Sequence, residues 1–482
     1  MTVTGATTAG ATRVVDTDHT GAPVHVTDLD RDEALWFLEE AAELRLVAER
    51  RTLRAVLSWC HANPAVDGAQ ASSWSEAVHQ PGGLDDPEPI GGDGAPLVAA
   101  FSAEPLGIAL QVSTTSALSW MADALELAHR LPRTHARVEA LEVPVWRARQ
   151  VATATSRLTP DAAAWVDQRV AGRAHRIGVR AIETLVTEAL ALFDPAQVAE
   201  TEDTAEDTWD VTLSDTDGAV DQRWAGTSFL HATGDTAVLR DFYDLVCQVA
   251  HDLLATHPHR TLGQRKIQAL QVIADRARST TTDGPRQRGG SYKLYLHLDC
   301  DDLLDRDLRD QREQREQQPP ALGTVERLGP ATVERIRRWL TGSRVTVQPV
   351  IDLGRTGEGA VSAVDAHDPP AWMREQVILR DRHCVFPDCR RDARGVDLDH
   401  IDPYVAPDDG GPPGQTRPGN LAPLCRRHHR AKTTTDPTRR WTYTRTTAGH
   451  YAWTGPDGQR LVVVPGLGTY EVGPGLAGGA PQ

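Results

Sequence analysis

The sequence lacks any long hydrophobic run. No stretch approaches the roughly 20 apolar residues that a membrane-spanning helix needs. The stretch from Met1 to Asp30 is rich in Thr, Ala and Gly and lacks the apolar core of a secretion signal. These absences argue against a membrane or secreted protein, so we expect a soluble, cytoplasmic protein with no membrane partner.

Cysteine is also scarce. Six cysteines occur in 482 residues, and three of them, Cys60, Cys247 and Cys300, are scattered in apolar or strand-like surroundings. Such positions are typical of buried thiols and do not form the framework of a disulfide-rich secreted domain. We therefore expect these thiols to remain reduced.

Lysine is nearly missing, with 3 lysines against 48 arginines. Two causes can produce this bias: GC-rich coding, or a preference for arginine in contacts with phosphate. The net charge of −16 argues against nucleic-acid binding by the chain as a whole. However, the segment from Arg374 to Arg445 has 14 basic and 10 acidic residues, net +4, and leaves −20 for the rest. A basic module on an acidic body predicts DNA contact confined to one end.

The other three cysteines lie close to one another, and a histidine joins them. The four residues form two short pairs separated by a long insert, and they are Cys384, Cys389, Cys425 and His428. Two short pairs let each turn present two ligands to one tetrahedral ion, which is the spacing of a four-ligand zinc site. The sequence therefore predicts a closed, structural zinc site.

Groups that zinc does not need lie between and beside these pairs. They are a carboxylate, an amide and two imidazoles, which suit a divalent metal and a general base: Asp399, Asn420, His400 and His429. Neighbouring residues on a helix point about 100° apart, so His428 and His429 cannot easily share one ion. We assign His428 to zinc, and we expect His429 to face Asp399 and His400.

This order of residues resembles the HNH endonucleases, whose nuclease module has a ββα-metal fold. The resemblance implies that Asp399 binds Mg²⁺ or Mn²⁺ and that His400 deprotonates the attacking water. It also implies that Asn420 fixes the loop or joins the metal, and that His429 is the last histidine, on the helix. Four basic residues flank the histidine pair and are either contacts for DNA phosphates or a solvated helix face: Arg426, Arg427, Arg430 and Lys432.

Helical periodicity dominates the N-terminal half. The pattern predicts a helix over 31–62 with a core-facing stripe that includes Leu35, Leu38, Leu53 and Val56, and further helices over 107–129, 135–156, 160–170 and 175–193. Residues 130–171 resemble a helical domain of unknown function that accompanies HNH modules in many actinobacterial proteins. That resemblance assigns no site residues.

The fold class that we expect is a mostly α N-terminal region, an α+β middle and a small zinc-stabilised ββα-metal module. The predicted layout is a disordered leader (1–29), a helical domain (30–197), an α+β region (198–365), a nuclease module with a terminal hairpin (366–465) and a flexible tail (466–482). The function that we expect is metal-dependent hydrolysis of DNA phosphodiester bonds. The alternatives are a zinc module that binds nucleic acid without cleaving it, and an interaction protein whose acidic helical body is the working part.

Overall fold

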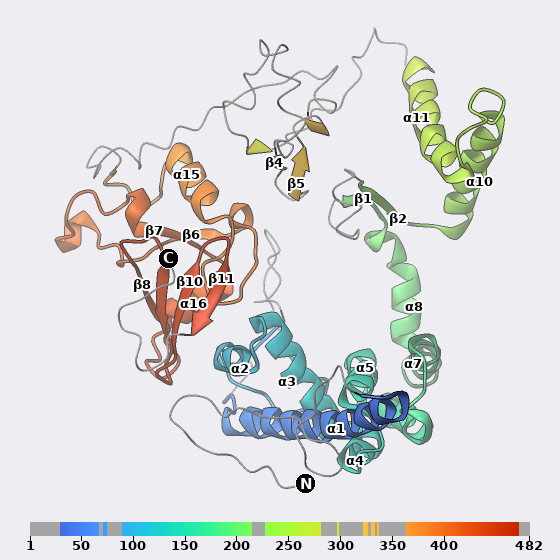
Figure 1. The fold of residues 1–482 in the computed structure, drawn as a ribbon, viewed down its shortest axis with the longest axis horizontal. Helices are drawn as coiled ribbons and strands as arrows, with labels where there is room; N and C mark the ends of the chain where they lie inside the picture. The colour runs from blue at the N-terminus through green and yellow to red at the C-terminus, as the bar shows by residue number, and fades with distance from the viewer. Residues whose placement is uncertain are drawn as a thin grey trace. The chain divides into compact units, whose positions relative to one another are not determined.

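The computed structural model describes residues 29–66, 71–74, 89–214, 227–280, 296–297, 322–325, 329–332, 335–336 and 363–471. The chain divides into two compact units, the first formed by residues 1–195 with 350–482 and the second by 196–349 (Figure 1). The first unit thus includes both the predicted helical domain and the predicted C-terminal module. Nearly all of the predicted leader lies outside the described residues.

The N-terminal part of the first unit is mostly helical, as predicted. Thr159 caps one of its helices by accepting a hydrogen bond from the Ala162 N–H, with Pro160 at the first helical position. The helices are α1 (Arg31–Ala62), α2 (Ala103–Leu110), α3 (Thr114–His129), α4 (Pro132–Glu139), α5 (Val145–Thr155), α6 (Pro160–Val170), the 3₁₀ turn η3 (Ala171–Arg173) and α7 (Val179–Phe193).

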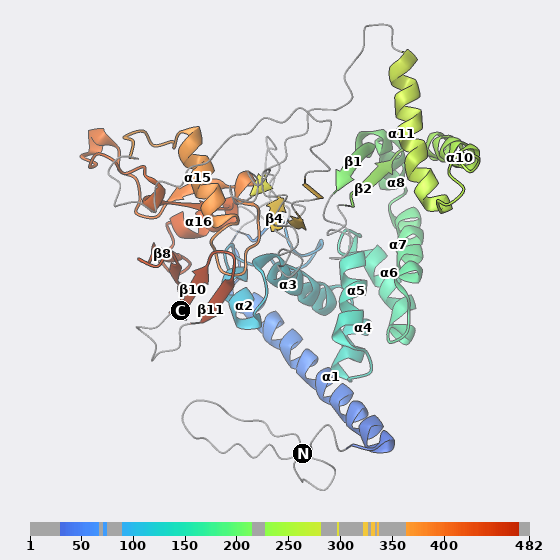
Figure 2. The ribbon, with the colours of Figure 1, turned by 45° about the horizontal axis from the view of Figure 1, so that its top comes forward.

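Helix α1 joins the helical core only through its C-terminal half. Its N-terminus is fixed by a capping box in which the Asp30 carboxylate accepts from the Glu33 N–H and the Glu33 carboxylate accepts from the Asp30 N–H. Leu53 and Val56 are buried in the helical core, whereas Leu35 and Leu38 are 49% and 68% exposed. The predicted core stripe is therefore wrong for the N-terminal half of α1, which extends beyond the neighbouring helices (Figure 2).

The predicted helix over 107–129 is broken into α2 and α3. Gln111 has a φ of +56°, a left-handed conformation that ends α2. Ser113 then caps α3, because its hydroxyl accepts a hydrogen bond from the Ser116 N–H at 3.2 Å. The resulting turn brings Thr114, the first residue of α3, against the C-terminal module.

The C-terminal module begins with α15 (Ala371–Asp381). The antiparallel strands β6 (Asp397–His400) and β7 (Leu421–Leu424) pair with His400 opposite Leu421. Helix α16 (Arg426–Thr433) follows directly. Short 3₁₀ turns fill the connections: η8 (Ala393–Gly395), η9 (Pro407–Asp409) and η10 (Pro418–Asn420).

A four-stranded antiparallel sheet of order β11-β10-β9-β8 stands where a terminal hairpin was predicted. The turns at Gly449 and Gly458, both with positive φ, lead from β8 (Thr442–Arg445) to β9 (Tyr451–Thr454) and then to β10 (Arg460–Val464). Strand β11 (Gly468–Glu471) pairs with β10, so this part of the predicted tail is ordered against the sheet.

The second unit mixes helices and small antiparallel sheets. Its elements are α8 (Pro195–Asp203), η4 (Ala205–Thr208), β1 (Asp210–Ser214), β2 (Phe229–Thr233), α10 (Thr236–Asp252), α11 (Leu262–Thr280), β3 (Leu296–His297), β4 (Leu322–Val325) and β5 (Gly329–Thr332). Alternating Val345 and Val347 predict a strand over 343–353, but these residues lie outside the part of the chain that the structure describes. None of the helices in the described part of the chain combines the length and the apolarity of a membrane span.

The core of the C-terminal module includes residues from the N-terminal segment. Ile108 of α2 belongs to the same buried cluster as Trp441 and Trp453, and Phe101 packs against that cluster. The Arg427 guanidinium is 2.5 Å from the Glu104 carboxylate, and the two side chains are 3% and 0% exposed. This buried ion pair joins α2 to α16, two elements that the sequence analysis assigned to separate domains.

We expect Glu104→Ala to lower the free energy of unfolding of the first unit by about 3–5 kcal/mol, because Arg427 would be left buried without its counter-charge. The double variant Glu104→Leu with Arg427→Met removes both charges and should recover most of that loss. Chemical unfolding measures both values. The exposed pair of Arg137 and Glu142 provides the control, since Glu142→Ala should cost less than about 1 kcal/mol. Equal costs for Glu104→Ala and Glu142→Ala would contradict the claim.

Candidate functional site

The predicted zinc ligands come together in the structure. The ligand atoms of Cys384, Cys389, Cys425 and His428 all lie within 4.8 Å of one another. Cys384 and Cys389 belong to a tight turn after α15, in which the Cys389 N–H donates to the Phe386 carbonyl at 3.1 Å. Cys425 is the N-cap residue of α16, and one helical turn brings His428 beside it. Three thiols and one imidazole fit a structural metal such as zinc and leave no open ligand position.

Electrostatics inside the cluster suit a metal cation. Burial raises the pKa of the Cys384 thiol well above its usual value, whereas hydrogen bonds with Cys384 and Cys389 hold the pKa of Cys425 far below it. Burial opposes a charge on His428, but the neighbouring Cys425 and Cys389 outweigh it and raise the pKa of His428 to about 10. Zinc needs thiolates and a neutral imidazole, so its binding would release protons from this cluster.

The histidine ring is fixed from several sides. Its Nδ1 lies 3.1 Å from Cys425 Sγ and 3.5 Å from Cys384 Sγ. The Phe386 ring stacks on it with centroids 3.8 Å apart and an interplanar angle of 11°. Its Nε2 lies 3.0 Å from the hydroxyl of Thr114. The atom that faces the thiols is therefore Nδ1.

His429 faces a different site, as the helix geometry predicts. Its Nε2 is 3.2 Å from Asp399 Oδ1, and its side chain is 36% exposed, whereas Asp399 is 4% exposed. The Asp399 carboxylate also accepts hydrogen bonds from Lys432 Nζ and Tyr443 OH, each at 2.7 Å. Burial acts to raise the pKa of Asp399, but its bonds to these three groups lower it overall, so Asp399 is ionised.

His400 is held by a threonine. The Thr416 hydroxyl lies 2.8 Å from His400 Nε2 and donates to the His367 carbonyl at 3.4 Å. Because Thr416 engages Nε2, Nδ1 is the ring nitrogen that is left to act as a base when the proton lies on Nε2. Burial, followed by the nearby His367, lowers the pKa of His400 and keeps the ring neutral near pH 7.

Asn420 closes the loop between β6 and β7. Its side-chain oxygen accepts from the Asp402 N–H at 2.9 Å, and its amide group donates to the carbonyls of Asp402 and Gln415. Its own carbonyl accepts from the Ile401 N–H at 2.9 Å. Of the two roles considered for Asn420, these bonds favour fixing the loop over joining a metal.

The four basic residues expected to contact phosphate do not share one environment. Arg426 and Arg430 are exposed on α16. Arg427 is buried against Glu104, so it is not available for a phosphate contact. Lys432 is turned inward, where its amine donates to Asp399 and to the His400 carbonyl. The expectation is therefore corrected for Arg427 and Lys432.

Several residues of the site could not be identified from the sequence. Thr416 orients His400, and Tyr443 of β8 reaches the Asp399 carboxylate. Thr114 lies 314 residues before the histidine that it contacts. Threonine and tyrosine have no metal-ligand spacing to reveal them, so only the fold identifies their roles.

The purified protein should carry about one tightly held zinc per chain, as a closed four-ligand site does. We expect Cys425→Ser to lose that zinc, because it removes one of the four ligands. Elemental analysis of the desalted protein measures the metal content. Cys60→Ser, which changes a buried thiol of the helical core, is the control and should keep the zinc. A well-folded wild-type protein without zinc would rule out this site.

Comparisons with known proteins find relatives in Mycobacterium tuberculosis. The chain is 27% identical over 461 residues to "Uncharacterized protein Rv3776" of strain ATCC 25618 / H37Rv, covering 89% of this chain and 82% of that protein. It is 32% identical over 146 residues to "Uncharacterized protein MT2160" of strain CDC 1551 / Oshkosh and to "Uncharacterized protein Rv2100" of strain ATCC 25618 / H37Rv, covering 28% of this chain and 25% of each relative. No family model and no solved structure matches the chain. The longest of these matches is long enough to include parts of both compact units.

Proposed function

We propose that this protein is a metal-dependent endonuclease that hydrolyses DNA phosphodiester bonds with an HNH-type active site. The observation that carries the proposal is the arrangement around Asp399. A buried, ionised carboxylate on β6 meets His429 on α16, and the next residue of β6 is a neutral, oriented histidine, His400. The two strands β6 and β7 are followed by the helix α16, which is the order of elements in a ββα-metal module. The cluster of three cysteines and one histidine lies next to them.

The residues that would hold a catalytic Mg²⁺ or Mn²⁺ are Asp399 and His429. Their facing atoms, His429 Nε2 and Asp399 Oδ1, lie 3.2 Å apart, and each would offer an electron pair to an ion that displaces the proton between them; the carboxylate is the oxygen ligand that such ions prefer. Bound there, the ion would neutralise charge on the phosphate and help the leaving oxygen. Lys432 and Tyr443 hold the second carboxylate oxygen, so they fix the direction in which Oδ1 points.

The proposed general base is His400. With Nε2–H donated to Thr416, its Nδ1 is free to take a proton from the water that attacks phosphorus. The lowered pKa supports this role, because a protonated imidazole cannot accept that proton. Asn420 holds the loop that begins directly after His400 and so maintains the position of β6 against β7.

DNA is the proposed substrate because basic residues gather in this module of an acidic chain. Residues 374–445 of this module have a net charge of +4, and Arg426 and Arg430 are exposed on the helix that carries His429. These arginines are the proposed phosphate contacts. A zinc module that binds DNA without cleaving it remains the competing function, and the pairing of Asp399 with His429 and the oriented His400 favour cleavage over it.

Purified protein should nick supercoiled plasmid DNA when Mg²⁺ or Mn²⁺ is added. We expect His400→Ala to reduce the nicking rate by roughly 100- to 10,000-fold, the range that a general base contributes. Zinc content should stay unchanged, because His400 is not in the cysteine cluster. His450→Ala, in the turn before β9, is the control and should nick at the wild-type rate. Wild-type nicking by His400→Ala would show that this histidine is not the base.

Substitutions of the two neighbouring histidines, His428 and His429, should have different effects on zinc content and nicking. His429→Ala should keep zinc and lose most metal-dependent nicking, since it removes the proposed partner of Asp399. His428→Cys should keep zinc, because a Cys-x-x-Cys pair also binds it, and should retain measurable nicking. Zinc analysis and nicking are measured side by side on both variants. Loss of zinc from His429→Ala, with nicking abolished in His428→Cys, would reverse the assignment.

A further inference from the structure

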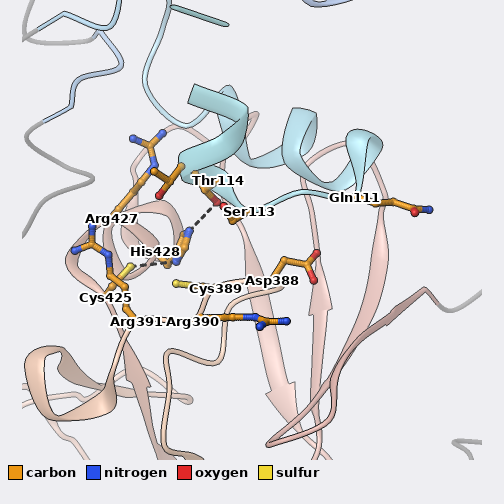
Figure 3. A pocket seen from close by; sticks show the side chains of 11 residues that line it. Gln111, Ser113, Thr114, Asp388, Cys389, Arg390, Arg391, Cys425, Arg427 and His428 are labelled. Atoms are coloured by element: carbon orange, nitrogen blue, oxygen red, sulfur yellow. Dashed lines mark hydrogen bonds between the residues drawn. The ribbon is translucent and has the colours of Figure 1, made fainter. Parts of the chain in front are cut away.

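The histidine of the cysteine cluster is hydrogen-bonded to the helical region. His428 presents Nδ1 to the thiols and Nε2 to the Thr114 hydroxyl at 3.0 Å (Figure 3). Both residues are buried, with 2% exposure for His428 and 7% for Thr114. The imidazole therefore spans the boundary between α16 and the start of α3.

The contact has a defined hydrogen-bond direction once a metal is bound. A neutral imidazole carries one proton, and a nitrogen that ligates a metal cannot carry it. Since Nδ1 faces the thiols, the proton of a metal-bound His428 would lie on Nε2, and the Thr114 oxygen would accept it. A partner at the second nitrogen fixes both the tautomer and the ring direction of a ligating histidine.

Independent contacts hold Thr114 in this place. The Ser113 cap fixes the first turn of α3. The buried pair of Glu104 and Arg427 joins α2 to α16 immediately before His428. Stacking on Phe386 keeps the imidazole from turning its edge away from the threonine. The threonine is thus presented by the fold of the helical region and not by the cysteine turns.

We propose that Thr114 is a positioning residue of the zinc site, and that the helical region thereby helps the C-terminal module to retain its metal. The inference rests on zinc binding by the cysteine cluster. It assigns the helical region a role at the metal centre that a self-contained zinc module would not need. By linkage, bound zinc also strengthens the docking of α3 on α16.

The test measures the transfer of zinc from the full chain to a chromogenic chelator and compares the Thr114 variants with the wild-type protein. A cavity of about 500 Å³ is lined by Thr114, Cys389, Cys425 and His428, so a chelator would have access to a metal bound there. Thr114→Val keeps the shape of the side chain and removes the acceptor. We expect it to weaken zinc binding by about 10- to 100-fold. Thr114→Ser keeps the hydroxyl and should remain close to wild type.

Thr115→Val is the matched control. Thr115 is the next residue of α3, is exposed and lines the same cavity, so its change should leave zinc release unaltered. The same Thr114→Val change is also made in the His428→Cys background. A cysteine ligand has no second nitrogen, so Thr114→Val should then add no further loss of zinc affinity.

The outcomes separate this inference from the zinc site itself. Wild-type affinity in Thr114→Val, with zinc present in the wild-type protein, overturns the inference and leaves the zinc site intact. An equal loss in the wild-type and His428→Cys backgrounds also overturns it, because the effect would then come from packing and not from the hydrogen bond. A wild-type protein that contains no zinc removes the basis of both proposals.

Discussion

Three consecutive residues at the start of α16 face three different parts of the molecule. Arg427 pairs with Glu104 of α2, His428 joins the cysteine cluster, and His429 meets Asp399. The pitch of an α-helix turns successive side chains by about 100°, so one short segment reaches all three directions. Because of this constraint, the helical region, the candidate zinc site and the candidate catalytic site are positioned by the same helical turn. A shift of α16 would disturb all three together.

Buried charge is the second organising feature of the first unit. Asp399 is buried with His429, Lys432 and Tyr443 around it, and Arg427 is buried with Glu104. Such pairs add little net stability compared with apolar residues of the same size, but a partner left alone is costly. They therefore favour one arrangement of the elements over slightly shifted ones. For the proposed metal site, which depends on the direction of a carboxylate oxygen, that selection matters more than the stability.

The terminal sheet also acts on the site, although it carries none of the predicted ligands. Tyr443 of β8 donates to Asp399, and its ring stacks on Trp453 of β9 at a centroid distance of 4.2 Å. The Trp453 indole donates to the Val385 carbonyl within the first cysteine turn. One strand pair thus supports both the candidate active site and the metal cluster.

The sequence by itself determined the features that depend on short separations along the chain. The spacing of Cys425 and His428 on one helical turn, and the different directions of His428 and His429, follow from helix geometry and appear in the structure. The mostly helical N-terminal region follows from apolar periodicity.

Tertiary structure alone decided which remote side chains complete these sites. Glu104, Thr114 and Tyr443 lie 323, 314 and 44 residues from their partners Arg427, His428 and Asp399. No local pattern links residues so far apart, because their contacts depend on how whole helices and strands pack. The same reason explains why the core stripe predicted for α1 is wrong in its N-terminal half. Periodicity defines an apolar stripe, and only packing decides whether another element covers it.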